Sequence, residues 1–300
     1  MLLNRINPFR ASLHLGYCDI RVIGPRASGK TTFLATLAYW PYTDGRYPIT
    51  SVQPMNDETV HLVDTARNIL ESGSQLEATN FGWHGSSYYN LLINLKPSLC
   101  QDPLFWLRQQ YLSFSLSCID YSGELIERLN TNSTDDISIS FLDDCALSSG
   151  LLLLIDATCR SSDSYYAKAF RILGQELNYR WRKGNRNLKN YRIAIVFSKF
   201  DQPEAWEHRN NLEKFININF PRTHNVFNNW YRTCGLSVTY FACSAFGMKG
   251  EPPAPNVLVE EGFGAKNGVL ADPSKWQPFG LVAPVYWLCT GKNNSWLRDF

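Results

Sequence analysis

The sequence has little net charge and none of the long apolar runs typical of membrane proteins. Its 29 basic and 27 acidic side chains leave a net charge of +2, so neither nucleic acid nor an anionic membrane is predicted as a partner. No apolar run exceeds five residues, the length of residues 151–155, whereas roughly 20 are needed to span a bilayer. Residues 1–15 contain Arg5 and Arg10 but no sustained apolar stretch, so we expect no signal peptide and no integral membrane span.

Paired cysteines at metal-binding spacing are also missing. The 300-residue chain has eight cysteines, but no two of them form a C-x-x-C pair, so the cysteine spacing of a metal site is absent. Cys18, Cys118, Cys159 and Cys243 lie in or next to apolar strand candidates, which suits buried free thiols. We therefore expect a reducing, cytoplasmic setting. The other four are Cys100, Cys145, Cys234 and Cys289.

What the chain does contain is a phosphate-loop pattern. Residues 24–31 read GPRASGKT, directly after the apolar strand candidate 18–23 and before the helical pattern 32–40. The glycines allow backbone N–H groups to close around phosphate oxygens at the positive end of a helix. Lys30 is expected to reach the β- and γ-phosphates, and the Thr31 hydroxyl to ligate Mg²⁺. This pattern predicts nucleotide binding.

Strands and helices alternate along most of the chain. A helical stretch at 165–182 and a helical region made of 204–218 and 226–231, broken at Pro221, alternate with the later strands, which predicts a largely parallel sheet. Only a loop joins 88–95 to 111–119, so we expect an antiparallel hairpin there. The predicted fold is α/β: a three-layer P-loop NTPase of Ras-like type with a mostly parallel sheet and one antiparallel edge strand. The expected strands are 18–23, 88–95, 111–119, 151–155, 193–197 and 237–242.

We expect a single domain over residues 1–300, with a core at about 17–245. Residues 41–85 are polar and turn-rich, and 246–275 are dense in Gly, Pro and Asn. Long irregular segments of this kind in a compact domain are usually functional or disordered. We therefore predict an insertion at about 41–85 and a C-terminal extension with a last helix at about 246–300.

Three further motifs follow predicted strands. Asp120-Tyr121-Ser122-Gly123 ends one strand, where the carboxylate can hold Mg²⁺ and the Gly123 N–H can meet a γ-phosphate. Ser198-Lys199-Phe200-Asp201 ends another. Asp201 can accept from the N1 and N2 donors of guanine, which adenine lacks, while the Lys199 stem lies across the base.

The last strand ends in Cys243-Ser244-Ala245, where a backbone N–H would approach the guanine O6. Ligands in open α/β sheets bind at the carboxyl ends of strands, and all four motifs are expected there.

With these four motifs in this order, the chain resembles the translation-factor and Ras-like class of P-loop GTPases over about residues 17–245. It looks most similar to the bacterial double-GTPase families of NTP-dependent conflict systems, because Glu124 follows Gly123 and a Pro278-Phe279-Gly280-Leu281 segment precedes the last helix. The resemblance implies GTP/GDP and Mg²⁺ as cofactors, and an effector or companion GTPase as partner.

The predicted site has three parts. The catalytic candidates are Lys30, Glu124 and Arg26, and the Mg²⁺ candidates are Thr31, Thr79 and Asp120. Nucleotide-binding candidates are Gly24, Ala27, Ser28, Gly29, Lys30, Thr31, Thr32, Gly123, Lys199, Asp201, Ser244 and Ala245.

The chain departs from the Ras-like pattern at several positions. Thr79 is our choice for the switch threonine, and Thr43, Thr50, Thr59 and Thr65 stay open. Arg26 replaces a glycine of the phosphate loop, and either contacts phosphate or a switch residue or points into solvent. Glu124 stands where a glutamine orients water, and either orients water or is only a first-turn acid. Ser198 replaces an asparagine that braces the phosphate loop, and its reach is shorter.

These features predict a guanine-nucleotide switch that binds Mg²⁺–GTP and hydrolyses it slowly. GTP would order residues 41–85 and 120–132, and the polar segment 125–140 has a composition typical of mobile chain. The alternatives are a non-hydrolysing GTP/GDP-binding scaffold and a P-loop kinase. The kinase would need a basic lid, for which the basic cluster at 180–189 is the candidate.

Overall fold

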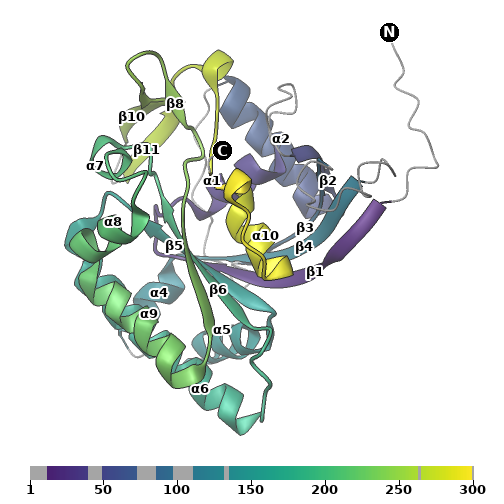
Figure 1. The fold of residues 1–300 in the computed structure, drawn as a ribbon, viewed down its shortest axis with the longest axis vertical. Helices are drawn as coiled ribbons and strands as arrows, with labels where there is room; N and C mark the ends of the chain where they lie inside the picture. Colours follow the sequence, from purple (N-terminus) through teal and green to yellow (C-terminus); the bar gives the residue numbers. More distant parts are fainter. Residues whose placement is uncertain are drawn as a thin grey trace.

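The computed structural model describes residues 12–39, 49–72, 86–96, 111–131, 135–262 and 265–298. Their central feature is a seven-stranded sheet in the order β2-β3-β4-β1-β5-β6-β7 (Figure 1). The strands β4, β1, β5, β6 and β7 run parallel to one another, and β3 is antiparallel to both of its neighbours. The predicted α/β class with a mostly parallel sheet is confirmed. The strands are β1 (Ser12–Ile23), β2 (Ile49–Pro54), β3 (Ser86–Leu95), β4 (Tyr111–Tyr121), β5 (Gly150–Asp156), β6 (Arg192–Ser198) and β7 (Ser237–Ala242).

The sheet extends one strand beyond the predicted hairpin of β3 and β4. β2 pairs with β3 and forms the edge, so the antiparallel strand β3 lies inside the sheet. Side chains reinforce this pairing: Thr50 Oγ1 donates to Asn94 O (3.1 Å), and Asn94 Nδ2 donates to Ser51 Oγ (2.9 Å). The helix α2 (Asp57–Ser72) follows at once. Part of the segment predicted as an irregular insertion, residues 49–72, is therefore ordered sheet and helix.

Helices cover both faces of the sheet, as Figure 1 shows. On one face, α1, α2 and α10 pack on apolar side chains such as Ile20, Val22 and Leu116. On the other, α4, α5, α6, α8 and α9 pack on Ile23 and Leu153. The two helical layers and the sheet between them are the three predicted layers, and one hydrophobic core lies on each face of the sheet. The remaining bounds are α1 (Lys30–Ala38), α4 (Glu124–Asn130), α5 (Asp136–Leu147), α6 (Asp163–Lys183), α7 (Pro203–Trp206), α8 (Leu212–Asn219), α9 (Pro221–Cys234) and α10 (Val282–Thr290).

The expectation of a mobile segment at 125–140 is wrong for most of its length. Residues 124–130 form α4, and 136–140 open α5, whose first turn is capped by the Asp135 carboxylate accepting from Ser138 N (2.8 Å). Leu125, Ile126 and Leu129 are buried. These apolar residues lie at helical spacing, and their burial outweighs the polar average of the segment.

The C-terminal extension contains two short hairpins and closes one core. The hairpins are β8 (Met248–Lys249) with β9 (Ala254–Pro255), and β10 (Val257–Gly262) with β11 (Ala265–Leu270). Beyond them the chain meets the end of β7, where Phe279 N donates to Ser244 O (3.0 Å) and Ser244 N to Phe279 O (3.1 Å). α10 then packs on β1, β4, β5 and β6.

The structure also shows how the cysteines are buried and whether a helix could span a membrane. Cys18, Cys118, Cys145 and Cys243 are buried free thiols, whereas Cys159 is half-buried because it lies in the turn after β5. Within the described ranges, every helix is too short or too polar to cross a lipid bilayer.

Candidate functional site: four strand ends around the phosphate loop

The loop between β1 and α1 has the backbone of a phosphate cradle. Ala27 and Gly29 have left-handed φ values of 59° and 84°, and Ser28 N donates to Pro25 O (3.3 Å), which closes the turn. A Cβ at Gly24 would lie 2.7 Å from Leu154 O, so glycine is needed where the loop leaves the sheet. The loop ends at the N-terminus of α1, whose positive end favours an anion.

Lys30 lies across this loop. Its Nζ donates to Gly24 O (2.9 Å) and Pro25 O (3.1 Å), which leaves one of its three ammonium N–H groups for a phosphate oxygen. Burial lowers the Lys30 pKa, and the nearby Asp120 carboxylate opposes this shift.

Thr31 and Asp120, two of the predicted Mg²⁺ candidates, lie within hydrogen-bonding distance of each other. Thr31 Oγ1, in the first turn of α1, donates to Asp120 Oδ2 near the end of β4 (2.9 Å). Asp120 is fully buried, and its Oδ1 has no hydrogen-bond partner in the described part of the chain. Burial raises the Asp120 pKa to about 6, although Lys30 and Thr31 lower it. A buried carboxylate oxygen without a donor beside a threonine hydroxyl fits Mg²⁺ held directly or through water.

This arrangement is not a self-sufficient metal cluster. In the ranges that the structure describes, no three His, Cys, Asp or Glu side chains are placed to hold a metal together. Mg²⁺ usually keeps several waters and binds through one or two protein groups plus substrate phosphates. The residues present fit such an ion.

Gly123 and Glu124 close on the phosphate loop from the end of β4. A Cβ at Gly123 would lie 2.3 Å from Arg26 N, so the two backbones are in direct contact. The Arg26 guanidinium forms an ion pair with the Glu124 carboxylate. Arg26 thus contacts the segment that follows Asp120.

Asp201 and Ser244 form the other end of the site. Asp201 is buried, and burial raises its pKa while hydrogen bonds from Ser244 and Gln202 lower it. The Ser244 N–H donates to Phe279 O, and its Oγ accepts from Gly247 N (2.8 Å). Phe200 N donates to Cys243 O (3.0 Å), which joins the two loops.

Ser198 links the two ends of the site. Its buried Oγ donates to Ser28 O (2.7 Å), so this hydroxyl braces the phosphate loop despite its short reach. This bond joins residues 170 positions apart.

The sequence analysis missed Asp156, at the end of β5. Lys199 has a left-handed φ of 55°, and its Nζ donates to Asp156 Oδ2 (2.6 Å). Asp156 also accepts from Thr158 N (2.9 Å). The sequence did hold a hint of this residue, because Asp156 is a carboxylate directly after the predicted strand 151–155.

The switch threonine is not placed. Thr79 and Thr43 lie outside the described residues. Thr50 belongs to β2, Thr59 accepts from Asn90 N (2.8 Å), and Thr65 lies 3.2 Å from His61 Nδ1. Thr50 therefore lies in β2, and Thr59 and Thr65 lie in α2.

Comparison with known proteins gave structural neighbours only, because no family model and no curated protein matches the chain. The chain is similar to an ADP-ribosylation-factor-like GTP-binding protein, the small COPII coat GTPase SAR1 from Encephalitozoon cuniculi, in complex with GDP: 11% identity, TM-score 0.35, covering 76% of this chain and 69% of that one. It is also similar to the Arl6 BBS3 small GTPase from Trypanosoma brucei with the bound nucleotide analogue GppNp. The identity is 9% and the TM-score 0.36, and the match covers 76% of this chain and 87% of that one. A third neighbour is Sup35 complexed with GMPPNP. The identity is 12% and the TM-score 0.34, and the match covers 82% of this chain and 41% of that one.

Proposed function

We propose that this chain binds Mg²⁺ with GTP or GDP and acts as a guanine-nucleotide switch. The observation that carries the proposal is the convergence of the Thr31–Asp120 hydrogen bond and the Gly123 backbone on one phosphate loop. Lys30 and the loop N–H groups bind the phosphates, and Thr31 and Asp120 hold the ion. Bound Mg²⁺ neutralises charge on the β- and γ-phosphates.

The base is read by Asp201, with Lys199 alongside. The Asp201 carboxylate accepts from guanine N1 and N2. We assign the guanine O6 contact to the Ala245 N–H, because the Ser244 N–H already donates to Phe279 O.

Hydrolysis depends on Glu124 and Arg26. An unpaired carboxylate beside the γ-phosphate repels it, whereas the Arg26 ion pair offsets that charge. Glu124 then orients the attacking water, and turnover is slow because one guanidinium is shared between the carboxylate and the phosphate. The same ion pair supports the second candidate, a non-hydrolysing scaffold in which Arg26 keeps Glu124 from water.

Single-turnover hydrolysis separates these two candidates. A switch releases phosphate from GTP at a rate that Lys30→Ala abolishes. A scaffold binds GTP with the same affinity and releases no phosphate above the Lys30→Ala background.

The position of the basic cluster at 180–189 does not support the kinase alternative, because a lid has to lie over the phosphate site. α6 begins at Asp163 beside the carboxyl end of β5 and ends at Lys183, before β6 starts at Arg192. The basic cluster therefore lies near the amino-terminal ends of the strands, whereas the four motifs lie at their carboxyl ends. Arg180 there is paired with Asp143 and Glu176.

The output of the switch is recognition by a protein. By resemblance to the double-GTPase families, that partner is a companion GTPase or an effector. Pull-down with wild type and Lys30→Ala, each loaded with a non-hydrolysable GTP analogue or GDP, tests whether a partner distinguishes the two states.

Base selectivity is the sharpest test of the proposal. Wild type should bind GTP at least about a hundredfold more tightly than ATP, because adenine offers no N1 and N2 donors to the buried Asp201 carboxylate. Asp201→Asn should weaken GTP and strengthen XTP, since xanthine has a carbonyl where guanine has the 2-amino group. Equal affinity of wild type for GTP and ATP would contradict guanine recognition, and Lys30→Ala controls for phosphate binding.

A further inference from the structure

The C-terminal extension lies against the loop that ends β7. Its residues 276–280 contact this loop twice, because Ser244 and Phe279 form an isolated antiparallel bridge, and Gly247 and Gln277 a parallel one. A Cβ at Gly247 would lie 1.8 Å from Gln277 O, so the two backbones are in direct contact. The loop covered in this way is the one to which we assigned the contact with guanine O6.

The peptide group between Ser244 and Ala245 is held from one side. Its carbonyl oxygen, Ser244 O, accepts from Phe279 N (3.0 Å). In a planar trans peptide group, the C=O and the N–H point in opposite directions. The Ala245 N–H therefore points away from Phe279, and no residue in the described ranges accepts a hydrogen bond from it.

The next peptide group is held by Trp276. The indole Nε1 of Trp276 donates to Ala245 O (2.8 Å). The indole ring itself stacks on Tyr39, the residue that ends α1, with centroids 6.2 Å apart and an interplanar angle of 13°. Both peptide groups that flank Ala245 are thus fixed by residues 276–280, and with them the two backbone torsion angles of Ala245.

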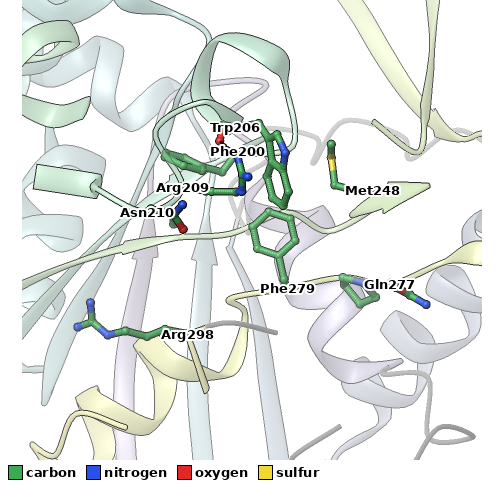
Figure 2. A pocket seen from close by; sticks show the side chains of 10 residues that line it. Phe200, Trp206, Arg209, Asn210, Met248, Gln277, Phe279 and Arg298 are labelled. Atoms are coloured by element: carbon green, nitrogen blue, oxygen red, sulfur yellow. Dashed lines mark hydrogen bonds between the residues drawn. The ribbon is translucent and has the colours of Figure 1, made fainter. Parts of the chain in front are cut away.

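Phe279 also connects the extension to the other loop of the base site. The rings of Phe279 and Trp206 line one cavity and lie next to each other in Figure 2, with centroids 5.6 Å apart. Trp206 belongs to α7 (Pro203–Trp206), which begins directly after the loop that carries Asp201. Residues 276–280 therefore join the loops that follow β6 and β7.

We propose that residues 276–280 position the loop that recognises guanine. Trp276 and the Phe279 backbone direct the Ala245 N–H towards guanine O6. Trp276 is a positioning residue, because it acts through the Ala245 backbone and not on the nucleotide. This inference rests on the function proposed above, and it adds that base selectivity depends on a segment outside the four motifs.

The test uses three nucleotides that differ at the base. GTP has O6 and both donors, 6-thio-GTP keeps the N1 and N2 donors but has sulfur, a weaker acceptor, in place of O6, and ITP keeps O6 but lacks the 2-amino group. Displacement of a fluorescent GDP from the full chain measures the three affinities. Wild type should bind GTP about fivefold or more tightly than 6-thio-GTP, the size expected for one hydrogen bond.

Trp276→Phe removes the indole N–H and keeps a ring against Tyr39. It should weaken GTP and ITP by the same factor, about fivefold, because both use O6, and weaken 6-thio-GTP less. The preference for GTP over 6-thio-GTP then falls, whereas the preference for GTP over ITP stays. A general loss of folded protein would weaken all three alike. Trp276→His keeps an N–H at the equivalent ring position and should retain more of the preference than Trp276→Phe.

Trp181→Phe is the matched control. It removes a hydrogen bond of the same kind, from Trp181 Nε1 to Ala146 O (3.1 Å), where α6 packs on α5. This bond lies near the amino-terminal ends of the strands, so the variant should leave both preferences unchanged.

The outcomes separate this inference from the function on which it rests. If wild type prefers GTP to ATP but Trp276→Phe leaves the GTP/6-thio-GTP ratio unchanged, guanine recognition stands and the positioning role of Trp276 is wrong. The same conclusion follows if Trp181→Phe lowers that ratio as much as Trp276→Phe does. If wild type binds GTP and ATP equally, the proposed function fails and this inference fails with it.

Discussion

The Gly123 backbone lies directly against the phosphate loop. A Cβ there would approach Arg26 N to 2.3 Å and the Pro25 carbonyl carbon to 2.7 Å. Both are backbone atoms, which cannot move aside as a side chain can. Glycine at this position therefore sets how closely the segment after β4 approaches the phosphate loop.

Gly123→Ala should weaken GTP more than GDP. The added methyl group has to push the loop and the start of α4 apart, which moves the Gly123 N–H away from the γ-phosphate. We expect a loss of GTP affinity of about tenfold or more, corresponding to about 1.4 kcal/mol. Fluorescence titration with labelled GTP and GDP measures it.

Gly184→Ala is the control, because the nearest atom to its Cβ would be Arg180 O at 3.3 Å and it lies at the end of α6, away from the site. An unchanged GTP/GDP ratio in Gly123→Ala would show that this backbone does not sense the γ-phosphate.

Three residues that the sequence assigned to this site, Lys30, Thr31 and Asp120, lie next to one another, but several hydrogen bonds of the site were not predicted. Lys30, Thr31 and Asp120 meet because parallel strands place their carboxyl ends at one edge. The Ser198 bond to Ser28 O depends on how closely two loops approach. The Lys199–Asp156 pair depends on a left-handed backbone at Lys199, which the sequence did not indicate.

Between elements, the phosphate loop and α4 are joined by the ion pair of Arg26 and Glu124. The Arg26 side chain is 64% exposed and that of Glu124 22%. Exposed pairs contribute only about 0.2–1 kcal/mol to stability, because water screens them. We therefore expect the pair to matter more for nucleotide state than for folding.

A double-mutant cycle of Arg26→Gln and Glu124→Gln tests this expectation. Arg26→Gln should weaken GTP more than GDP, because it leaves the Glu124 carboxylate unpaired beside the γ-phosphate. The double variant should recover most of that loss, because the repelling carboxylate is also gone. Additive effects on GTP affinity would show that the two side chains act independently.

Element boundaries were predicted best where apolar residues have a regular period. α6 was expected at 165–182 and spans 163–183. β2 was not expected, because its pairing depends on the edge of β3, more than 30 positions away. α4 and α5 were mistaken for mobile chain because average composition hides a buried stripe such as Leu125, Ile126 and Leu129.

At the scale of the whole molecule, α10 completes the core that carries the phosphate loop. It packs on four strands of the sheet, and Arg192 Nη1 donates to Leu288 O (2.9 Å). Leu288 is buried, next to Gly150, where a Cβ would lie 3.3 Å from Leu288 Cδ2. The C-terminal extension is therefore part of the folded unit.

Leu288→Ala should destabilise the protein by about 2–5 kcal/mol, since it removes buried methyl groups and leaves a cavity. Urea unfolding measures the change. Leu147→Ala at the end of α5 is the matched control, because Leu147 is 77% exposed and the same substitution there should stay within about 0.5 kcal/mol. Equal midpoints for the two variants would contradict a core role for α10.

The late position of α10 also has a consequence for synthesis of the protein. A nascent chain that has emerged only through β7 holds the phosphate loop and the strand ends, but residues 282–290 are not yet made. Until then, side chains such as Val22 and Leu154 lack one of their covering layers. Exposed apolar surface of this kind makes folding intermediates prone to aggregate. We therefore expect the ribosome-bound chain to need chaperones, and nucleotide loading to follow translation.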